Sequence, residues 1–259
     1  MNVLSRWWRA RTLRRHAIPQ DVFDTALARL PILRGLDISE RTRLREAASL
    51  FIHRKAFSAA GGAEVDDAIQ LTIALQACLL TLNLGEDSYR GWSEIILYPD
   101  EFLRHREEMD EAGVVHHSRD ILAGESWHGG PLVLSIADVT YSGQPDGVNV
   151  VLHEFAHKLD MLNGDANGFP PLHRGMDAAS WARDFSAAYA DLCARVDAGV
   201  NTEIDPYATT DPAEFFAVLT EVFFETPHQL NTEYPDVYRQ LQQFYRQHPL
   251  MRQEPHEHA

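Results

Sequence analysis

The chain has 259 residues, of which 45% are hydrophobic, and its formal net charge is −15. This length suits one large domain or two small ones, and the hydrophobic content allows a sizeable core. The negative charge argues against a general nucleic-acid-binding protein, because phosphate groups would be repelled. No stretch approaches the roughly 20 apolar residues of a membrane-spanning helix, and the basic N-terminus lacks the apolar run of a secretory signal. We therefore expect a soluble protein of the reducing cytoplasm.

Positive charge is concentrated near the N-terminus. Two tryptophans, Trp7 and Trp8, are interleaved with a run of arginines: Arg6, Arg9, Arg11, Arg14 and Arg15. Such a segment could contact a membrane surface or an acidic partner. The simpler interpretation, and our expectation, is a solvated arm with little packing.

The first third of the chain has helical periodicity. Residues 37–57 (DISERTRLREAASLFIHRKAF) begin with Asp37 or Ser39 as a helix cap and then repeat apolar residues at helical spacing. Residues 64–85 show a second, more apolar helical pattern that ends at Gly85. We expect the N-terminal helical region, residues 1–85, to pack on the rest of the chain.

The two cysteines lie in apolar helical patterns, Cys78 in IALQACLLTL and Cys193 in AYADLCARV. Two cysteines do not make a disulfide framework. We predict packed thiols without a redox role.

The pattern changes in the middle of the chain. Residues 92–102 (WSEIILYPDEF) contain a short β-branched run that ends at Pro99. Residues 113–139 are typical of strands separated by glycine turns, and residues 143–147 (GQPDG) indicate a loop. These features predict a small mixed sheet.

Helical periodicity returns after the sheet. It covers four segments with clear start and stop signals: residues 149–164, 177–199, 211–227 and 234–250. The chain therefore reads as a helix-rich α+β protein, and we expect residues 86–259 to form the catalytic region of one compact unit.

The most informative motif is HEFAHKLD at residues 153–160. On a helix, residues four apart lie on one face, so His153 and His157 can both direct a ring nitrogen at one zinc ion. Glu154 lies about 100° around the helix and can reach the water side of the metal without becoming a ligand. This is the place of the general base in zinc proteases.

The context supports a zinc site over a chance match. The motif lies in a largely apolar helix, which draws its histidines inward, and the strand pattern GPLVLSI precedes it, where an extended peptide could pair. The alternative is an ordinary helix with two partly buried, hydrogen-bonded histidines.

The third protein ligand is less clear from spacing. A downstream HxxGxxH pattern is absent, and the other histidines considered lie outside a helical frame or in the strand region: His116, His117, His128 and His173. The better candidates lie in the helix that starts at Asp211, namely Glu214, Glu221 and Glu225. Glu214 could instead complete a capping box with Asp211. Spacing alone leaves Glu214 and Glu221 as alternatives.

Two acidic residues are placed so that they could hold the metal ligands in position. Asp160 shares the face of His153 and His157, and its carboxylate could fix an imidazole tautomer. It could equally be a surface aspartate paired with Lys158 or Arg174. Glu221 is the other candidate for this supporting role.

Two segments, HEFAHKLDMLNGDANG and YATTDPAEFFAVLTEVFFETP, resemble the Mlc titration factor A family of bacterial zinc peptidases. The resemblance extends to GWSEIILYPDEF and GPLVLSIADV and is weaker in the N-terminal helices. A more distant resemblance is to the catalytic domain of anthrax lethal factor. That domain also has an HEFxHxxD helix and a tyrosine seven residues before the glutamate of an EFFA segment.

The family resemblance implies a zincin-like fold and one zinc ion held by His153, His157 and Glu214. It implies that Glu154 is the base and that Tyr207, seven residues before Glu214, steadies the oxyanion. It thus favours Glu214 over Glu221 as the third ligand.

Two functions are consistent with these features. The first is a gluzincin-type zinc metallopeptidase, and the resemblance implies aminopeptidase-like action on small substrates. The GxMEN signature of large zinc aminopeptidases is missing, so endopeptidase action stays open. The second is a regulator that binds and sequesters a transcriptional repressor of sugar-uptake genes, which is where the family's name comes from. A purely structural zinc site is disfavoured, because such sites use four protein ligands.

Overall fold

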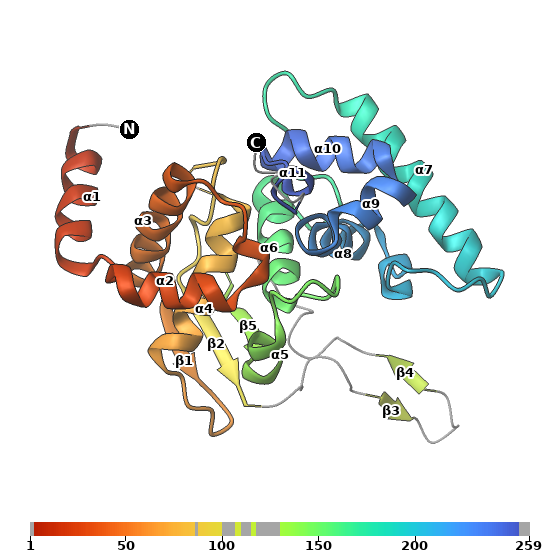
Figure 1. Cartoon of the computed structure of the whole chain (residues 1–259). Helices are drawn as coiled ribbons and strands as arrows, with labels where there is room; N and C mark the ends of the chain where they lie inside the picture. Colours follow the sequence, from red (N-terminus) through yellow and green to blue (C-terminus); the bar gives the residue numbers. More distant parts are fainter. Residues whose placement is uncertain (1–2, 86–87, 100–106, 110–114, 118–129, 254–259) are drawn as a thin grey trace.

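The computed structural model describes residues 3–85, 88–99, 107–109, 115–117 and 130–253 (Figure 1). The α-helices in this part are α1 (Val3–His16), α2 (Gln20–Arg29), α3 (Ile38–Arg54), α4 (Asp67–Leu80), α5 (Ile136–Tyr141), α6 (Val150–Asp160), α7 (Ala178–Asp197), α8 (Pro212–Glu225), α9 (Pro227–Glu233), α10 (Pro235–Tyr245) and α11 (Pro249–Gln253). The 3₁₀-helices are η1 (Pro31–Leu33), η2 (Met161–Asn163) and η3 (Pro206–Thr209). The strands are β1 (Ala56–Ala59), β2 (Glu94–Tyr98), β3 (Glu107–Met109), β4 (Val115–His117) and β5 (Leu132–Ser135).

The N-terminal segment is solvated as we expected, because most of its described side chains are exposed, but it is a helix that contacts α3. The α1 sequence contains no glycine or proline to break it, and the Arg9 guanidinium pairs with the carboxylate of Glu46 on α3. Thr12 is buried, whereas 57% of the Trp7 surface stays exposed. The ion pair between Arg9 and Glu46 therefore links α1 to α3.

The two predicted N-terminal helices are present as α3 and α4. Asp37 is the cap of α3, and it forms a reciprocal capping box with Glu40. The C-terminal end of the predicted helix is instead β1, which starts at Ala56. Both cysteines are free thiols; Cys78 is buried, as predicted for a packed thiol, and Cys193 is half-buried.

Three strands form a sheet in the order β1-β2-β5, and all of its described strands run parallel. This differs from the predicted mixed sheet. Parallel neighbours need a crossover connection, which α4 provides between β1 and β2. A separate antiparallel pair consists of β3 and β4. The predicted strand through Ile136 ends at Ser135, whose hydroxyl caps α5 by accepting a hydrogen bond from the backbone of Asp138.

Helix α6 lies between the N-terminal elements and the C-terminal helices (Figure 1), and it contacts α4, α8 and β5. Its buried apolar residues are Val151, Leu152, Phe155, Ala156 and Leu159. Helix α8 is buried along nearly its whole length. Two buried helices in contact therefore bring their polar residues together inside the protein.

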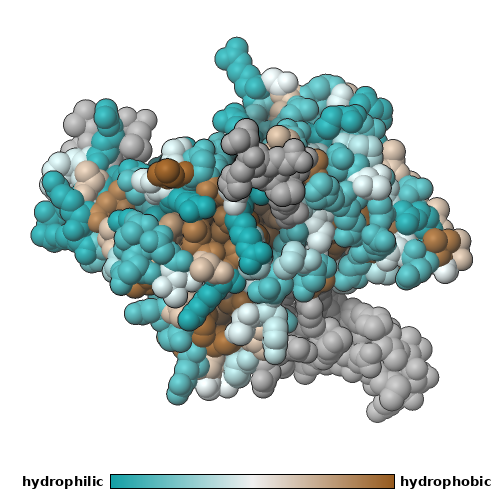
Figure 2. Space-filling view, in the orientation of Figure 1, coloured by the Kyte–Doolittle hydropathy of each residue, from teal (hydrophilic) through white to brown (hydrophobic). Residues whose placement is uncertain are grey.

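The surface contrasts with this core. Hydrophilic residues cover most of the face in Figure 2, and the hydrophobic ones visible there gather mainly over the N-terminal half. Among the described residues, no helix is both long and apolar enough to cross a membrane.

Candidate metal centre

Helix α6 places His153 and His157 side by side. The helix begins after Asn149, whose side chain accepts a hydrogen bond from the backbone N–H of Leu152 and so caps the first turn. One turn separates the two histidines, and their rings lie 4.8 Å apart with 3.2 Å between the Nε2 atoms. His153 is buried and His157 is half-buried. Both Nε2 atoms therefore face one small region.

Helix α8 adds Glu214 to this region. One Glu214 oxygen lies 2.9 Å from His153 Nε2, and the other lies 3.6 Å from His157 Nε2. Asp211 caps α8 by accepting hydrogen bonds from the backbones of Ala213 and Glu214, but the Glu214 side chain turns to α6 and does not complete a capping box. The local geometry of the helix start thus leaves this carboxylate available to the histidines.

These three residues suit a transition metal. One ligand atom from each of His153, His157 and Glu214 lies within 4.8 Å of the others. Two imidazoles and one carboxylate form a donor set that zinc accepts in catalytic sites. The residues present therefore fit the metal that the motif implies.

The electrostatics of the cluster favour a cation. Burial by itself lowers the pKa of His153, but the charge of Glu221 and hydrogen bonds to Glu214 and Glu221 outweigh it and raise the pKa to about 10. Burial by itself raises the pKa of Glu214, yet its contacts with the two histidines lower that pKa far below the usual range. Negative charge is thus held at the place where a metal would bind.

Glu221 occupies a different position from Glu214. One of its oxygens lies 2.7 Å from His153 Nδ1, and the other accepts a hydrogen bond from the backbone N–H of Asn149. Glu221 thus contacts the ring on the side away from Glu214 and also holds the start of α6. The two carboxylates that spacing left as alternatives lie on opposite nitrogens of one histidine.

A buried polar network supports the start of α6. Glu225 accepts hydrogen bonds from the backbones of Gly143 and Gly147 and from Asn149 Nδ2. Asn149 Nδ2 also donates to Gln76 Oε1, at 2.6 Å. Burial raises the pKa of Glu225 to about 9 despite these donors. In the sequence, Asn149 could have been found from its cap position just before the helical pattern, whereas no pattern pointed to Gln76.

Asp160 is fully buried, so it is not the surface aspartate of the alternative interpretation. Its Oδ2 accepts hydrogen bonds from the backbones of Asn167 and Gly168, at 2.8 and 2.6 Å. Gly168 has φ of +75°, and a Cβ there would lie 2.3 Å from the carbonyl oxygen of Pro212. Asp160 therefore fixes a loop that closely approaches the start of α8.

Two buried polar atoms near this loop lack partners within the described part of the chain, Asp160 Oδ1 and His157 Nδ1. The residues are three apart on α6, and the charge of His157 lowers the pKa of Asp160, although burial raises it overall. Lys158, an alternative partner of Asp160, instead donates to the carbonyl oxygen of Gly130.

Glu154 and Tyr207 border the cluster. Glu154 is half-buried and has no hydrogen-bond partner among the described residues. Tyr207 lies on η3, which Asp205 caps, and its ring centroid is 6.2 Å from that of His153. The tertiary structure thus brings Tyr207 to the same histidine as Glu214.

The remaining histidine candidates lie elsewhere. His173 stacks on Phe244 and donates from Nε2 to the Phe244 carbonyl oxygen at 2.7 Å. His116 and His117 belong to β4, but their side chains, like the whole of His128, lie outside the described residues.

The fold and the cluster define a class of protein. A helix-rich α+β chain with two histidines one helical turn apart and a glutamate from a second helix has the donor set of metallopeptidases. Residues 4–246 match the model of the family described as glucose-regulated metallo-peptidase M90. The chain therefore belongs to this metallopeptidase family.

Named relatives agree with this assignment. A protein named Mlc titration factor A from Salmonella arizonae is 40% identical over 250 residues, which cover 95% of this chain and 97% of the relative. Proteins of the same name from Escherichia fergusonii and Salmonella gallinarum are 40% and 41% identical, and each match covers 89% of this chain and 87% of the relative. The family resemblance inferred from the sequence is thus confirmed.

Proposed function

We propose that the protein is a zinc-dependent peptidase of the gluzincin type, with a zincin-like fold, that hydrolyses peptide bonds in the cytoplasm. The observation that carries the proposal is the cluster of His153, His157 and Glu214 beside the half-buried Glu154. Three protein ligands leave a coordination position open, as catalytic zinc sites require. Aminopeptidase-like action on small peptides is the specificity that we propose.

The three ligands would hold one zinc ion, whose Lewis acidity lowers the pKa of water toward about 7 and polarises a carbonyl group. Glu154 follows His153 directly, so its carboxylate points about 100° away from the ligand face. It can therefore accept a proton from the attacking water and pass it to the leaving amine. Its lack of another hydrogen-bond partner among the described residues keeps it available for that role.

Tyr207 is the proposed donor to the oxyanion that develops on the substrate carbonyl. Its position on η3, close to His153, supports this role. Such donors act because they are already oriented in a site from which water is excluded.

Glu221 and Asp160 are proposed to position the ligands. Glu221 contacts His153 Nδ1 at 2.7 Å, which fixes the ring so that Nε2 faces Glu214. Asp160 is the buried carboxylate that shares a helix face with His157, whose Nδ1 lacks a partner within the described residues. We assign it the corresponding role for His157.

Binding of a transcriptional repressor is the second candidate function. It rests on the name of the relatives, Mlc titration factor A, which refers to titration of another protein. The two functions are compatible, because a partner can bind an outer surface while the cluster hydrolyses peptides.

Glu154→Gln separates the two functions. Glutamine has nearly the same shape and Glu154 is not a proposed ligand, so the variant should keep its zinc. Because the amide cannot accept the proton, peptide cleavage should fall by about 10²–10⁴-fold. Binding to the repressor should be unchanged.

Cleavage of a peptide library and repressor binding are measured on the same zinc-loaded protein, with chelator as a second control. Glu203→Gln makes the same change at an exposed position that is not part of the cluster, and it should leave cleavage unchanged. If Glu154→Gln cleaves peptides as fast as the parent, the peptidase mechanism is wrong and the repressor-binding function is favoured.

A further inference from the structure

Asn149, the cap of α6, contacts three helices at once, and it is fully buried. Its side-chain amide donates to Gln76 Oε1 on α4 and to Glu225 Oε1 on α8, at 2.6 and 2.7 Å. Its backbone N–H donates to Glu221 on α8, and its carbonyl oxygen accepts a hydrogen bond from the backbone N–H of His153 at 2.9 Å. Asn149 therefore joins α4 and α8 to the first turn of the helix that carries the histidines.

Capping alone does not explain an asparagine at this position. A cap needs only an acceptor for a backbone N–H, and Asn149 Oδ1 provides it to Leu152 at 2.9 Å. Aspartates serve this purpose at the start of α3, α4, α7 and α8. The amide of Asn149 adds two donors that a carboxylate lacks. These donors contact Gln76 and Glu225, so they have a task besides capping.

Glu221 carries the position of Asn149 to His153. One oxygen of its carboxylate accepts the hydrogen bond from the Asn149 backbone, and the other lies 2.7 Å from His153 Nδ1. On the other side of the same ring, His153 Nε2 lies 2.9 Å from Glu214. A displacement of Asn149 would therefore move the carboxylate that orients the His153 ring.

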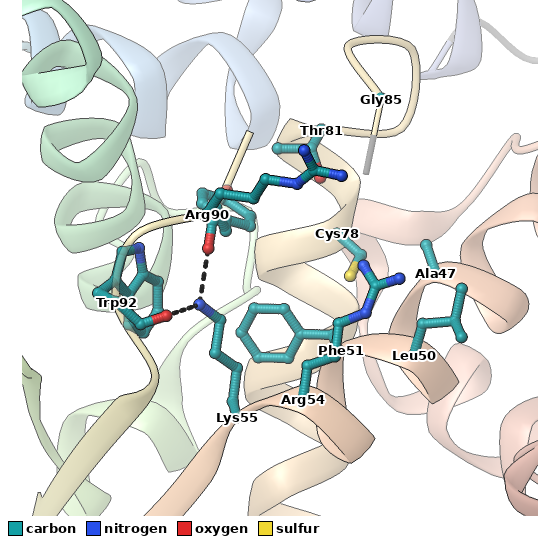
Figure 3. A pocket seen from close by; sticks show the side chains of 11 residues that line it. Ala47, Leu50, Phe51, Arg54, Lys55, Cys78, Thr81, Gly85, Arg90 and Trp92 are labelled. Carbon is teal, nitrogen blue, oxygen red and sulfur yellow. Dashed lines mark hydrogen bonds between the residues drawn. The ribbon is translucent and has the colours of Figure 1, made fainter. Parts of the chain in front are cut away.

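Helix α4 presents two different faces to its surroundings. Cys78 lines a cavity of about 190 Å³ together with side chains of α3 (Figure 3). Gln76 comes two residues earlier, about 200° around the helix. Its Oε1 accepts a hydrogen bond from Asn149, and its Nε2 donates to Ser142 Oγ at 2.7 Å. Gln76 thus connects the N-terminal region to the start of α6.

The surroundings of Asn149 are tightly packed. Gln76 and Glu225 are both buried, and Glu225 also accepts a hydrogen bond from the backbone N–H of Gly143 at 3.2 Å. A Cβ on Gly143 would lie 2.8 Å from a methyl group of Leu30 and 3.3 Å from Gln76 Oε1. A displacement of Asn149 would break buried hydrogen bonds, and an unsatisfied buried polar group is costly. Gln76 and Glu225 therefore keep Asn149 in one place.

We propose that Asn149 is a positioning residue for the metal ion. It holds Glu221, which orients His153, while Gln76 and Glu225 hold Asn149 itself. The inference rests on the proposed function, because it concerns the zinc ligands of that site. It extends the residues on which zinc binding depends to α4, a helix that carries none of the three proposed ligands.

Two variants test this role. Asn149→Ser keeps an acceptor that can cap α6 but removes both amide donors, so the affinity for zinc should fall about tenfold. Gln76→Met removes an acceptor on α4 and leaves the cap and Glu221 unchanged, so the affinity should fall about threefold or more. Competition with a chromogenic chelator measures the Kd for zinc on the full chain after metal removal.

Cobalt gives a second measurement that does not depend on catalysis. The visible absorption bands of a Co²⁺ ion bound in place of zinc depend on the arrangement of its ligands. Both variants should shift these bands relative to the parent protein, because the His153 ring is no longer held in one orientation.

Asp37→Ala is the control for a general loss of stability. It removes the cap of α3, which contacts α1 and α4, so it should destabilise the fold without acting on Glu221. Its Kd for zinc and its cobalt spectrum should match those of the parent.

A double-mutant cycle shows whether Asn149 acts through Glu221. Glu221→Ala removes the carboxylate that links Asn149 to His153. In this background Asn149→Ser should change the Kd for zinc by less than about twofold, because the effects of residues in one network are not additive. A residue that merely supports folding would weaken zinc binding by the same factor in both backgrounds.

Three results would overturn the proposal. These are a Kd and a cobalt spectrum like those of the parent in both Asn149→Ser and Gln76→Met, an equal effect of Asn149→Ser with and without Glu221, or an equal loss of affinity in Asp37→Ala. If Asn149→Ser does not fold, Gln76→Met decides. A parent protein that binds zinc but cleaves no peptide would contradict the peptidase function and leave this role standing, whereas a parent that binds neither metal would contradict both.

Discussion

The two faces of α6 differ in how they are held. On one face, His153 and His157 meet charged side chains from α8, and each contact is a directed one between named polar atoms. On the other face, Phe155 packs among the rings of Phe51, Tyr89 and Trp92. The ammonium group of Lys55 lies beside these rings, where it donates to a backbone carbonyl oxygen and contacts the face of the Trp92 ring.

This contrast teaches that one helix separates two tasks. The aromatic face contributes stability through buried area, which depends little on the placement of any one atom. The polar face arranges the nitrogen and oxygen atoms that could hold a metal ion, and changes there should affect metal binding and catalysis more than folding. Substitutions on the two faces should therefore have different signatures.

The largest effect is expected at Glu214. Glu214→Ala removes the carboxylate next to both Nε2 atoms, so purified protein should contain little zinc by mass spectrometry where the parent holds about one equivalent. Glu221→Gln keeps an acceptor for His153 Nδ1 and should bind zinc only about 10–100-fold more weakly. Loss of zinc in the Glu221 variant alone would reverse the two assignments.

On the aromatic face, Phe155→Ala should reduce the free energy of unfolding by about 3–5 kcal/mol, because Phe155 is fully buried and its removal leaves a cavity. Urea denaturation with chelator present measures this without a contribution from metal. Phe155→Leu is a milder substitution and should reduce the free energy of unfolding by less. If Phe155→Ala kept full stability but lost zinc affinity, the separation of tasks would be wrong.

Tyr207→Phe tests the polar face without touching a ligand. Removing one oxyanion donor typically costs about 10²–10³-fold in rate, while zinc content and unfolding should hardly change. Tyr189→Phe is the matched control, because its hydroxyl donates to the carbonyl of Thr209 at the end of the same η3 segment. Equal turnover in both variants would exclude the proposed role of Tyr207.

The last effect concerns pH. The pKa of Glu225 is about 9 in the folded protein against an ordinary value of 4.5, so the folded state keeps a proton that the unfolded state releases. The free energy of unfolding should therefore fall as pH rises from about 5 to 9, by up to about 1.4 kcal/mol per pH unit from this group.

The glutamine in Glu225→Gln cannot titrate, so the free energy of unfolding of this variant should change less with pH over that range. Urea denaturation at several pH values measures this. Glu203→Gln, at an exposed position, should keep the slope of the parent. A parent and a Glu225 variant with the same slope would show that Glu225 ionises normally and that the network around Asn149 does not depend on its proton.

Much of the local structure could be predicted from the sequence. The helices at α3, α4, α6, α7, α8 and α10 follow from apolar periodicity and from caps such as Asp37 and Asp211. Three features could not. The α1 segment packs on α3 because a partner for its charges lies there, β1 exists because β2 pairs with it, and α5 replaces the end of a strand pattern because Ser135 caps it.

The sequence by itself determined the pairing of His153 and His157 and the place of Glu154, because a helix of 3.6 residues per turn fixes neighbours that are one and four residues apart. Spacing alone could not choose between Glu214 and Glu221, which lie seven residues apart on one face of α8, although the family resemblance favoured Glu214. Only the tertiary structure shows which of the two carboxylates lies beside both Nε2 atoms. The apolar surfaces of α6 and α8 fix how the two helices cross, and that crossing directs Glu214 to both Nε2 atoms and Glu221 to Nδ1 of His153.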